Sequence, residues 1–178
     1  MKHIIFIRHG ESVANAEGWI AGRFDAELTE IGRNQAASAA EKLVASNKKI
    51  DIIITSPMSR AHDTAEIIAK AIGYPADKIK IDYNLIELEM GKWTKGLRKQ
   101  LFDDLASGVF PNEYLDGVID NVRKLLAELK RMPAQNIMLV SHNETGRALL
   151  QLIKNPDNPR NASKLPHIKN CDPIYIKI

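Results

Sequence analysis

The chain has 178 residues, a formal net charge of +3 and 44% hydrophobic residues, which suits a single domain that buries a substantial core. Its Lys and Arg residues are scattered among Asp and Glu, without a block of about five or more like charges, so neither nucleic acid nor a membrane surface is expected as a partner. Cys171 is the single cysteine, which excludes an internal disulfide, and no run approaches the ~18 apolar residues of a membrane helix, so we expect a cytoplasmic protein.

The first predicted element is a buried strand over residues 4–7, made of β-branched and aromatic residues. Such a run ordinarily ends in a turn or a helix cap, but this one ends in Arg8 and His9. A helix is predicted next over residues 28–46, where Thr29 precedes an apolar-periodic stretch in the manner of a capping box.

A second strand-and-helix unit follows. Residues 52–54 are an apolar strand, and a helical stretch then runs to Gly73. Ser56 is expected to cap this helix, with Pro57 at its first position. A short strand is predicted near residues 79–82.

The second half of the chain begins with an irregular stretch. Glycine and tryptophan residues there indicate a lid-like excursion over about residues 89–112. Apolar residues spaced three and four apart predict a helix over residues 114–132. An apolar strand over residues 137–140 leads into another helix, and a proline-rich loop spans residues 155–166. Alternating isoleucines over residues 173–178 suit an edge strand.

Continuous apolar strands followed by helices are typical of a parallel sheet that is covered on both faces. The predicted fold class is therefore α/β: a three-layer α/β/α sandwich whose central sheet is mostly parallel, with one antiparallel edge strand. Residues 1–178 are expected to form one domain, since neither repeats nor a linker interrupt the pattern.

Basic side chains follow the predicted strands at the points where the strands end. Arg8 and His9 follow the first strand, Arg60 lies one turn into the next helix, and His142 follows the later strand. The carboxyl ends of parallel strands meet at one edge of a sheet, together with helix N-termini. Two arginines and two histidines at that edge predict a site for a phosphate or a carboxylate.

Several other phosphate chemistries lack their motifs. No Asp-x-Asp follows a strand and no His-x-x-x-His occurs, so neither a metal site nor a cofactor is expected. The glycines at 91 and 96 have nucleotide-loop spacing, but Leu97 and Arg98 replace the required Lys and Ser or Thr. Cys171 lacks an arginine six residues on. Histidine therefore remains the candidate nucleophile.

Five blocks of the sequence, in this order, resemble the histidine phosphatase superfamily, the phosphoglycerate mutase-like group. They are "RHGES", "LTEIGRNQA", "TSPMSRAHDTA", "LIELEMGKW" and "VSHNETGRA". One Arg-His-Gly triplet would be weak evidence, but the five blocks cover nearly the whole chain. The resemblance implies that His9 becomes phosphorylated and that Arg8, Arg60 and His142 surround the phosphoryl group.

The resemblance also implies an acid and several substrate contacts. Glu87 falls where members that act on small phosphate esters carry the general acid and base, and Glu89 is a rival two residues on. The resemblance implies that Arg8, Arg60 and His142 are catalytic, together with His9 and Glu87. Substrate contacts are expected from Arg8, Asn15, Gly22, Arg60, His142 and Asn143.

The chain departs from the family's pattern in two places. Asn143 and then Glu144 follow the second histidine, where glycine is frequent, and the acid could discourage highly anionic substrates. Only 55 positions separate Glu87 from His142, and "LEMG" replaces the mutase sequence after the acid. A short lid holds a phosphorylated product poorly, which favours a phosphatase over a mutase.

The favoured function is accordingly a metal-independent phosphomonoesterase that acts on a small phosphorylated metabolite through a phosphohistidine. A phosphoglycerate mutase is the principal alternative. A protein-phosphohistidine phosphatase and a non-catalytic module that binds phosphorylated ligands stay open as well. His3, His62 and His167 are interpreted as structural.

Overall fold

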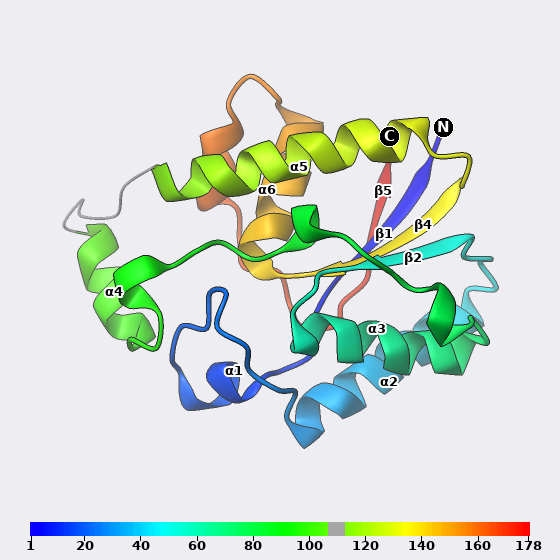
Figure 1. Cartoon of the computed structure of the whole chain (residues 1–178), viewed down its shortest axis with the longest axis horizontal. Helices are drawn as coiled ribbons and strands as arrows, with labels where there is room; N and C mark the ends of the chain where they lie inside the picture. The colour runs from blue at the N-terminus through cyan, green and yellow to red at the C-terminus, as the bar shows by residue number, and fades with distance from the viewer. Residues whose placement is uncertain (107–112) are drawn as a thin grey trace.

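Five strands form the central sheet, in the spatial order β3-β2-β4-β1-β5 (Figure 1). The computed structural model describes residues 1–106 and 113–178. Within them the strands are β1 (His3–Arg8), β2 (Ile52–Thr55), β3 (Lys80–Ile81), β4 (Asn136–Ser141) and β5 (Ile174–Lys177).

The strand directions confirm the predicted mixed sheet. β1 and β4 are parallel, with Ile4 opposite Ile137, and β2 is parallel to both β4 and β3. β5 runs antiparallel to β1 at the edge, with Ile176 opposite Ile4. Because β1, β2 and β4 run the same way, their carboxyl ends lie at one edge of the sheet.

Helices cover both faces of this sheet. In Figure 1, α5 and α6 lie on one side of the strands and α2 and α3 on the other. The larger helices are α2 (Glu30–Ala45), α3 (Ser59–Ile72), α4 (Arg98–Ala106), α5 (Glu113–Arg131) and α6 (Asn143–Lys154). Shorter helical segments are α1 (Val13–Glu17), Ala76–Lys78, Tyr83–Leu85, Gly91–Trp93 and Pro159–Lys164. No helix among the described residues has the length and apolar content needed to cross a membrane.

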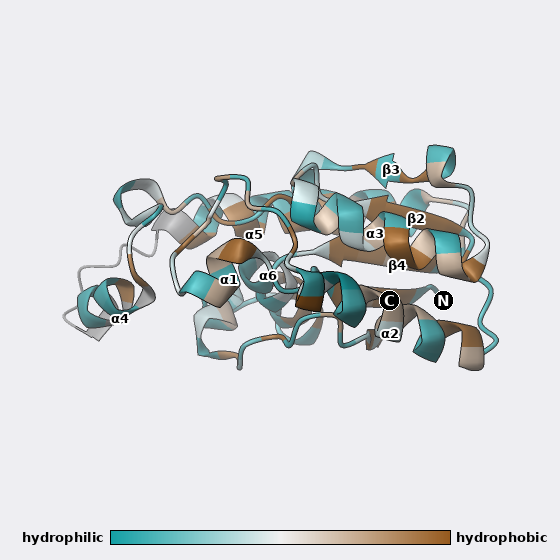
Figure 2. Cartoon of the chain, turned by 90° about the horizontal axis from the view of Figure 1, so that it is seen from below, coloured by the Kyte–Doolittle hydropathy of each residue, from teal (hydrophilic) through white to brown (hydrophobic). Residues whose placement is uncertain are grey.

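The core is split between the two faces because side chains alternate along each strand. Ile4 and Phe6 of β1 pack with α5 and α6, whereas Ile5 and Ile7 pack with α2 and α3. In Figure 2 the strands β2 and β4 are coloured hydrophobic, whereas the helices around them carry both hydrophilic and hydrophobic residues. These two apolar layers account for the uninterrupted hydrophobic runs in the strands.

Three helical features differ from the prediction. α3 begins at Ser59 with Met58 at its N-cap, so Ser56 does not cap it. α1 was not predicted, and its capping box joins Ser12 to Asn15. α4 lies in the stretch that was expected to be an irregular lid, and residues 107–112 of that stretch lie outside the described residues.

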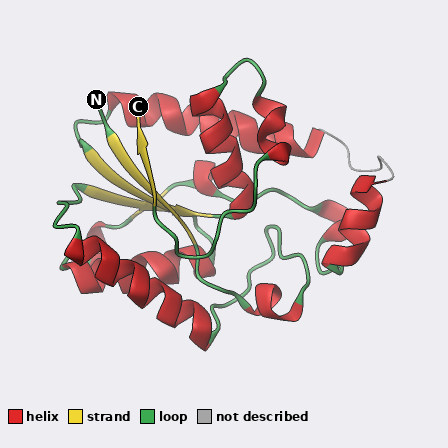
Figure 3. Ribbon diagram, turned by 180° about the vertical axis from the view of Figure 1, so that it is seen from behind, coloured by secondary structure: helices red, strands yellow, loops and turns green. Residues whose placement is uncertain are grey.

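The loop after α1 pairs with the segment before α4. Trp19 forms a bridge with Leu97, and the backbone N–H groups of Ile20 and Lys95 donate to the carbonyls of Gly96 and Ile20. Figure 3 shows α1 and α4 beyond the end of the sheet that is opposite the two chain termini. These segments therefore stand at the sheet edge where the carboxyl ends of β1, β2 and β4 meet.

Candidate active site

A cleft of about 730 Å³ opens at the carboxyl ends of the strands. Every predicted site residue except His142 lines it: Arg8, His9, Asn15, Gly22, Arg60, Glu87 and Asn143. His142 is fully buried directly beside it, with its ring centroid 5.2 Å from that of His9. The fold thus brings together all eight residues that the sequence analysis selected.

The position of His9 is fixed by the end of β1. Its backbone N–H donates to the Ser141 carbonyl of β4 at 2.9 Å. A Cβ atom on the next residue, Gly10, would lie 2.3 Å from the Gly32 carbonyl oxygen, so only glycine allows α2 to begin against this loop. In the Arg-His-Gly sequence, the glycine after His9 thus allows the backbone to lie in close contact with the backbone of α2.

Two contacts determine the tautomer of His9. Its Nδ1 lies 2.7 Å from the Gly10 carbonyl oxygen, which can only accept, so Nδ1 carries the proton. Arg60 Nε–H donates to His9 Nε2 at 3.3 Å. Burial, and then the positive charges of Arg60 and Arg8, hold the pKa of His9 well below its usual value. His9 is therefore neutral, with a lone pair on Nε2.

Arg60 is the second residue of α3 and is almost fully buried. Its two terminal nitrogens donate to the carbonyls of Gly22, at 2.8 Å, and Phe24, at 3.1 Å. Burial lowers the pKa of Arg60, while the carboxylates of Glu87 and Asp25 oppose that shift. Gly22 has φ of +52° and Met90 lies against it, so the loop that holds Arg60 requires glycine there.

The C-terminal segment holds Arg8 and the loop that follows β1. Arg8 Nη1 donates to the Ile168 carbonyl at 2.7 Å, and Asn170 Nδ2 donates to the His9 carbonyl at 2.6 Å. Asn15 Oδ1 accepts from the Ser12 backbone N–H at 3.3 Å and from Asn170 at 3.5 Å. Asn15 thus joins α1 to this segment while it lines the cleft.

His142 is oriented by Ser56, a residue whose role sequence reasoning missed. His142 Nε2 lies 2.7 Å from Ser56 Oγ, and both residues are fully buried. Among the described residues, His142 Nδ1 has no hydrogen-bond partner. Burial, followed by the charges of Arg60, His9 and Arg8, lowers the pKa of His142 well below its usual value. The protein alone holds His142 neutral, so a bound anion is needed to favour its charged form.

Glu87 lies against the N-terminus of α6. Its carboxylate accepts from the backbone N–H groups of Leu88 at 2.9 Å and of Glu144 and Thr145, both at 3.3 Å. Burial, and then the charge of Glu144, raise the pKa of Glu87 despite these bonds. Its rival Glu89 is exposed, forms a 3.9 Å ion pair with Arg23 and does not line the cleft. The geometry therefore favours Glu87 as the acid.

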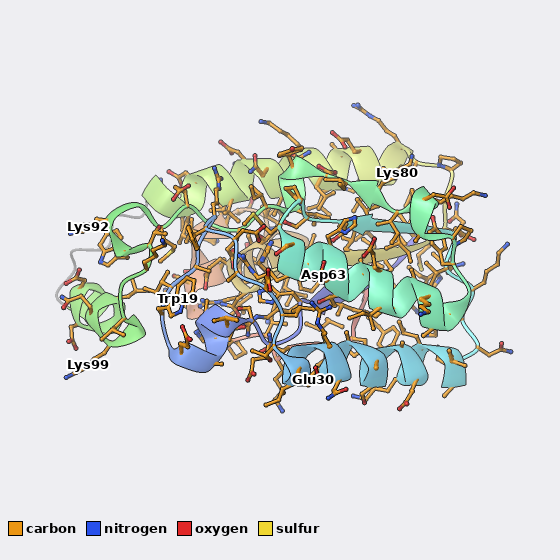
Figure 4. The ribbon with its side chains drawn as sticks, turned by 60° about the horizontal axis from the view of Figure 1, so that its bottom comes forward. Trp19, Glu30, Asp63, Lys80, Lys92 and Lys99 are labelled. Atoms are coloured by element: carbon orange, nitrogen blue, oxygen red, sulfur yellow. The ribbon has the colours of Figure 1, made fainter. Side chains whose placement is uncertain are left out.

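The lining beyond the predicted site residues, which we call the outer cleft, has side chains of two kinds. The apolar ones include Ile20, Leu88, Met90, Leu101 and Leu115. The polar ones include Glu144, Arg147, Ser163 and His167. In Figure 4, Trp19, which also lines the cleft, lies at the same end of the molecule as Lys92 and Lys99, and Lys80 lies toward the opposite end.

Two residues of the cleft lining have surroundings that the sequence did not indicate. His167 was interpreted as structural but lines the cleft. Asn143 lines the cleft, yet its amide nitrogen donates to Glu144 Oε1 at 2.6 Å and its oxygen accepts from the Ile168 N–H at 3.0 Å. Both polar ends of Asn143 are thus engaged by the protein, and its contact with substrate stays a prediction.

One group of potential metal ligands occurs in the described part of the chain. It is formed by His62, Asp63 and Glu66 of α3, whose ligand atoms lie within 4.8 Å of one another. None of these three residues lines the cleft. The cleft itself carries histidine and arginine nitrogens with one raised-pKa carboxyl, a set suited to an anion.

Comparison with known proteins identifies a family whose sequence pattern matches this chain. The family model described as "Histidine phosphatase superfamily (branch 1)" matches residues 4–177. A relative from Photorhabdus laumondii, named "Probable phosphoglycerate mutase GpmB", is 32% identical over 188 aligned positions, covering 96% of this chain and 82% of the relative.

Two further similarities are to proteins named as phosphatases. A "Putative phosphoserine phosphatase 2" from Hydrogenobacter thermophilus is 30% identical over 166 positions, covering 86% of this chain and 79% of that one. The structure of a mycobacterial glucosyl-3-phosphoglycerate phosphatase with VO3 has a TM-score of 0.83 and 26% identity, covering 99% of this chain and 91% of that one. The similar fold thus extends over almost the whole chain.

Proposed function

The chain belongs to the histidine phosphatase superfamily (branch 1), and from that membership we propose that it is a metal-independent phosphomonoesterase that works through a phosphorylated His9. The observation that carries the proposal is the state of the His9 ring. Nδ1 is committed to the Gly10 carbonyl and Nε2 keeps its lone pair beside Arg60, in a cleft that also holds Glu87. A neutral imidazole with a cation alongside is suited to attack phosphorus.

In the first half of the reaction, the lone pair of His9 Nε2 attacks the phosphorus atom. An N–P bond forms while the ester P–O bond breaks. The leaving oxygen takes the proton of the Glu87 carboxyl, whose raised pKa keeps that proton available nearer to neutrality. Arg8 and Arg60 counter the charge that spreads over the phosphoryl oxygens.

In the second half, the Glu87 carboxylate takes a proton from a water molecule. The water oxygen attacks phosphorus, the N–P bond breaks and phosphate leaves with neutral His9 restored. His142 Nδ1 is buried without a partner among the described residues, which suits donation to a phosphoryl oxygen once the anion has raised the pKa of the ring.

The test is hydrolysis of a chromogenic phosphate ester in the presence of EDTA. We expect phosphate release by the wild-type chain and a loss of about 10³-fold or more in His9→Ala, because the nucleophile is removed. The wild-type chain should also form an acid-labile phosphoenzyme. Activity that disappears with EDTA, or that persists in His9→Ala, would contradict the proposal.

A phosphoglycerate mutase is the second candidate, because the relative from Photorhabdus laumondii carries that name. A mutase returns the phosphoryl group from His9 to a hydroxyl of the bound acid instead of to water. Incubation with a phosphoglycerate separates the two reactions. Isomerisation without release of phosphate would support the mutase, and release of phosphate without isomerisation would support the phosphatase.

A further inference from the structure

Glu144 is a charged residue of the cleft that the proposed reaction does not use. It is the second residue of α6, two positions after His142, and it lines the cleft together with Glu87. A carboxylate beside an anion-binding site opposes the binding of any further negative charge. Glu144 is therefore placed where it can influence which substrates bind.

The Glu144 side chain is held firmly. Arg147 Nη1 donates to both of its carboxylate oxygens, at 2.9 and 3.0 Å, and Asn143 Nδ2 donates to one of them at 2.6 Å. Arg147 Nη2 donates to the Ser163 carbonyl. The side chain of Glu144 is 21% exposed, against 9% for Arg147. The carboxylate is thus the more accessible member of the ion pair for a ligand in the cleft.

Arg147 does not cancel the charge of Glu144 at the reacting groups. The Glu144 backbone N–H donates to Glu87 Oε2 at 3.3 Å, so the two glutamates are immediate neighbours. Among the causes that raise the pKa of Glu87, the charge of Glu144 ranks next after burial. The charge of Glu144 therefore acts on the Glu87 carboxyl, the group that the proposed reaction places beside the leaving oxygen of an ester.

The apolar side chains of the cleft lining offer an anionic leaving group no compensation. Ile20, Met90, Leu101 and Leu115 face the same cleft with apolar side chains, which cannot replace the hydration of a carboxylate. Arg8 and Arg60 are engaged with backbone carbonyls and with His9. Arg147 also lines the cleft, but its guanidinium is already paired with Glu144. A second anionic group on the substrate would thus meet hydrocarbon, or the Glu144 carboxylate beside an arginine that this carboxylate already engages.

We propose that Glu144 is a specificity-determining residue that disfavours phosphate esters whose alcohol carries a carboxylate and leaves esters of uncharged alcohols, such as polyols, as the substrate class. The inference rests on the proposed function, because it places the phosphoryl group at His9 and the alcohol in the outer cleft. It sets this chain apart from a relative whose name refers to a phosphoglycerate.

The test compares glycerol 3-phosphate with 3-phosphoglycerate, which differ in a hydroxymethyl group against a carboxylate. We expect the wild-type chain to have the higher kcat/KM for glycerol 3-phosphate. Glu144→Gln should shift the ratio of the two kcat/KM values toward 3-phosphoglycerate by about 10-fold, the effect of one partly neutralised like charge. Glu144→Asp keeps the charge and should keep the wild-type preference.

Glu89→Gln is the matched control, since it removes the same charge from an exposed glutamate outside the cleft lining. It should leave the ratio unchanged. Calorimetric titration of His9→Ala and of His9→Ala/Glu144→Gln with the two esters gives the same comparison without catalysis. A binding preference that shifts with Glu144→Gln, in a chain that releases no phosphate, would support the inference while the proposed phosphatase fails.

Three outcomes would overturn the inference. The first is an unchanged ratio in Glu144→Gln for both hydrolysis and binding, in a chain that still releases phosphate. The second is an equal shift in Glu89→Gln, which would show a general charge effect. The third is the absence of measurable binding of either ester to His9→Ala. Thermal unfolding of each variant establishes that it is folded. If Glu144→Gln is not folded, Glu144→Ala removes the same charge and takes its place in the comparison.

Discussion

Removal of the Ser56 hydroxyl tests whether His142 must be held in one orientation. In Ser56→Ala, His142 Nε2 loses its 2.7 Å contact in a fully buried setting. Its Nδ1 already has no partner among the described residues, so neither ring nitrogen would then be fixed by the protein. An unsatisfied buried polar group costs about 1–3 kcal/mol, and the same amount lost from the transition state lowers kcat about 5- to 150-fold.

The assay is kcat and KM for a phosphate ester, with urea unfolding of the same variants. Ser56→Thr keeps a hydroxyl and should recover most of the activity. Thr55→Val is the matched control, because the neighbouring Thr55 hydroxyl is equally buried but contacts the Ser56 and Val140 carbonyls instead of a catalytic group. It should lower stability without lowering kcat.

The reasoning is refuted if Ser56→Ala keeps kcat within about 2-fold of the wild type, a change too small for a lost transition-state contact, while its stability falls as in Thr55→Val. That result would make Ser56 a purely structural residue. It would also remove the argument that the orientation of His142 matters for phosphoryl transfer.

Two further predictions concern the groups with shifted pKa values. In Glu87→Gln, kcat should fall about 10²-fold or more for an alkyl phosphate. It should fall much less for a nitrophenyl phosphate, because that leaving group needs no proton. Equal losses of kcat on both esters would contradict the role of Glu87 as the acid. For the wild type, kcat on the alkyl phosphate should fall as pH rises through the raised pKa of Glu87, and this alkaline limb should disappear in Glu87→Gln. The free energy of unfolding should fall as pH drops below the pKa of histidine in the unfolded chain. His9 and His142 have lowered pKa values and stay neutral in the folded chain, whereas the same histidines take up protons in the unfolded chain. Each histidine contributes about 1.4 kcal/mol per pH unit below ~6.5 until its folded pKa is reached, so urea midpoints at pH 7 and pH 5.5 should differ less in His142→Asn than in the wild type.

Much of the fold could be predicted because burial leaves a local pattern in the sequence. β1, β2 and β4 are covered on both faces, so each is an uninterrupted apolar run, and β5 alternates because it is an edge strand. α5 is long enough for its apolar spacing to be unmistakable. Short helices leave a weak pattern, and α1 and α4 were missed for that reason.

The residues of the candidate site could also be selected from the sequence. Arg8 ends β1, His9 and His142 directly follow β1 and β4, and Arg60 is the second residue of the helix that follows β2. In a parallel sheet, that placement alone brings such residues to one edge. Glu87 was identified only by resemblance, because it lies just after the short helical segment Tyr83–Leu85, where no strand ending marks it.

The chemical state of each residue was decided by packing between distant segments. Arg60 reaches His9 across 51 positions of sequence, and Ser56 reaches His142 across 86. The choice of Glu87 over Glu89 depends on which carboxylate lies against the N-terminus of α6. Local periodicity records how each element is buried. The lowered pKa of His9 and the raised pKa of Glu87 arise only where those elements meet.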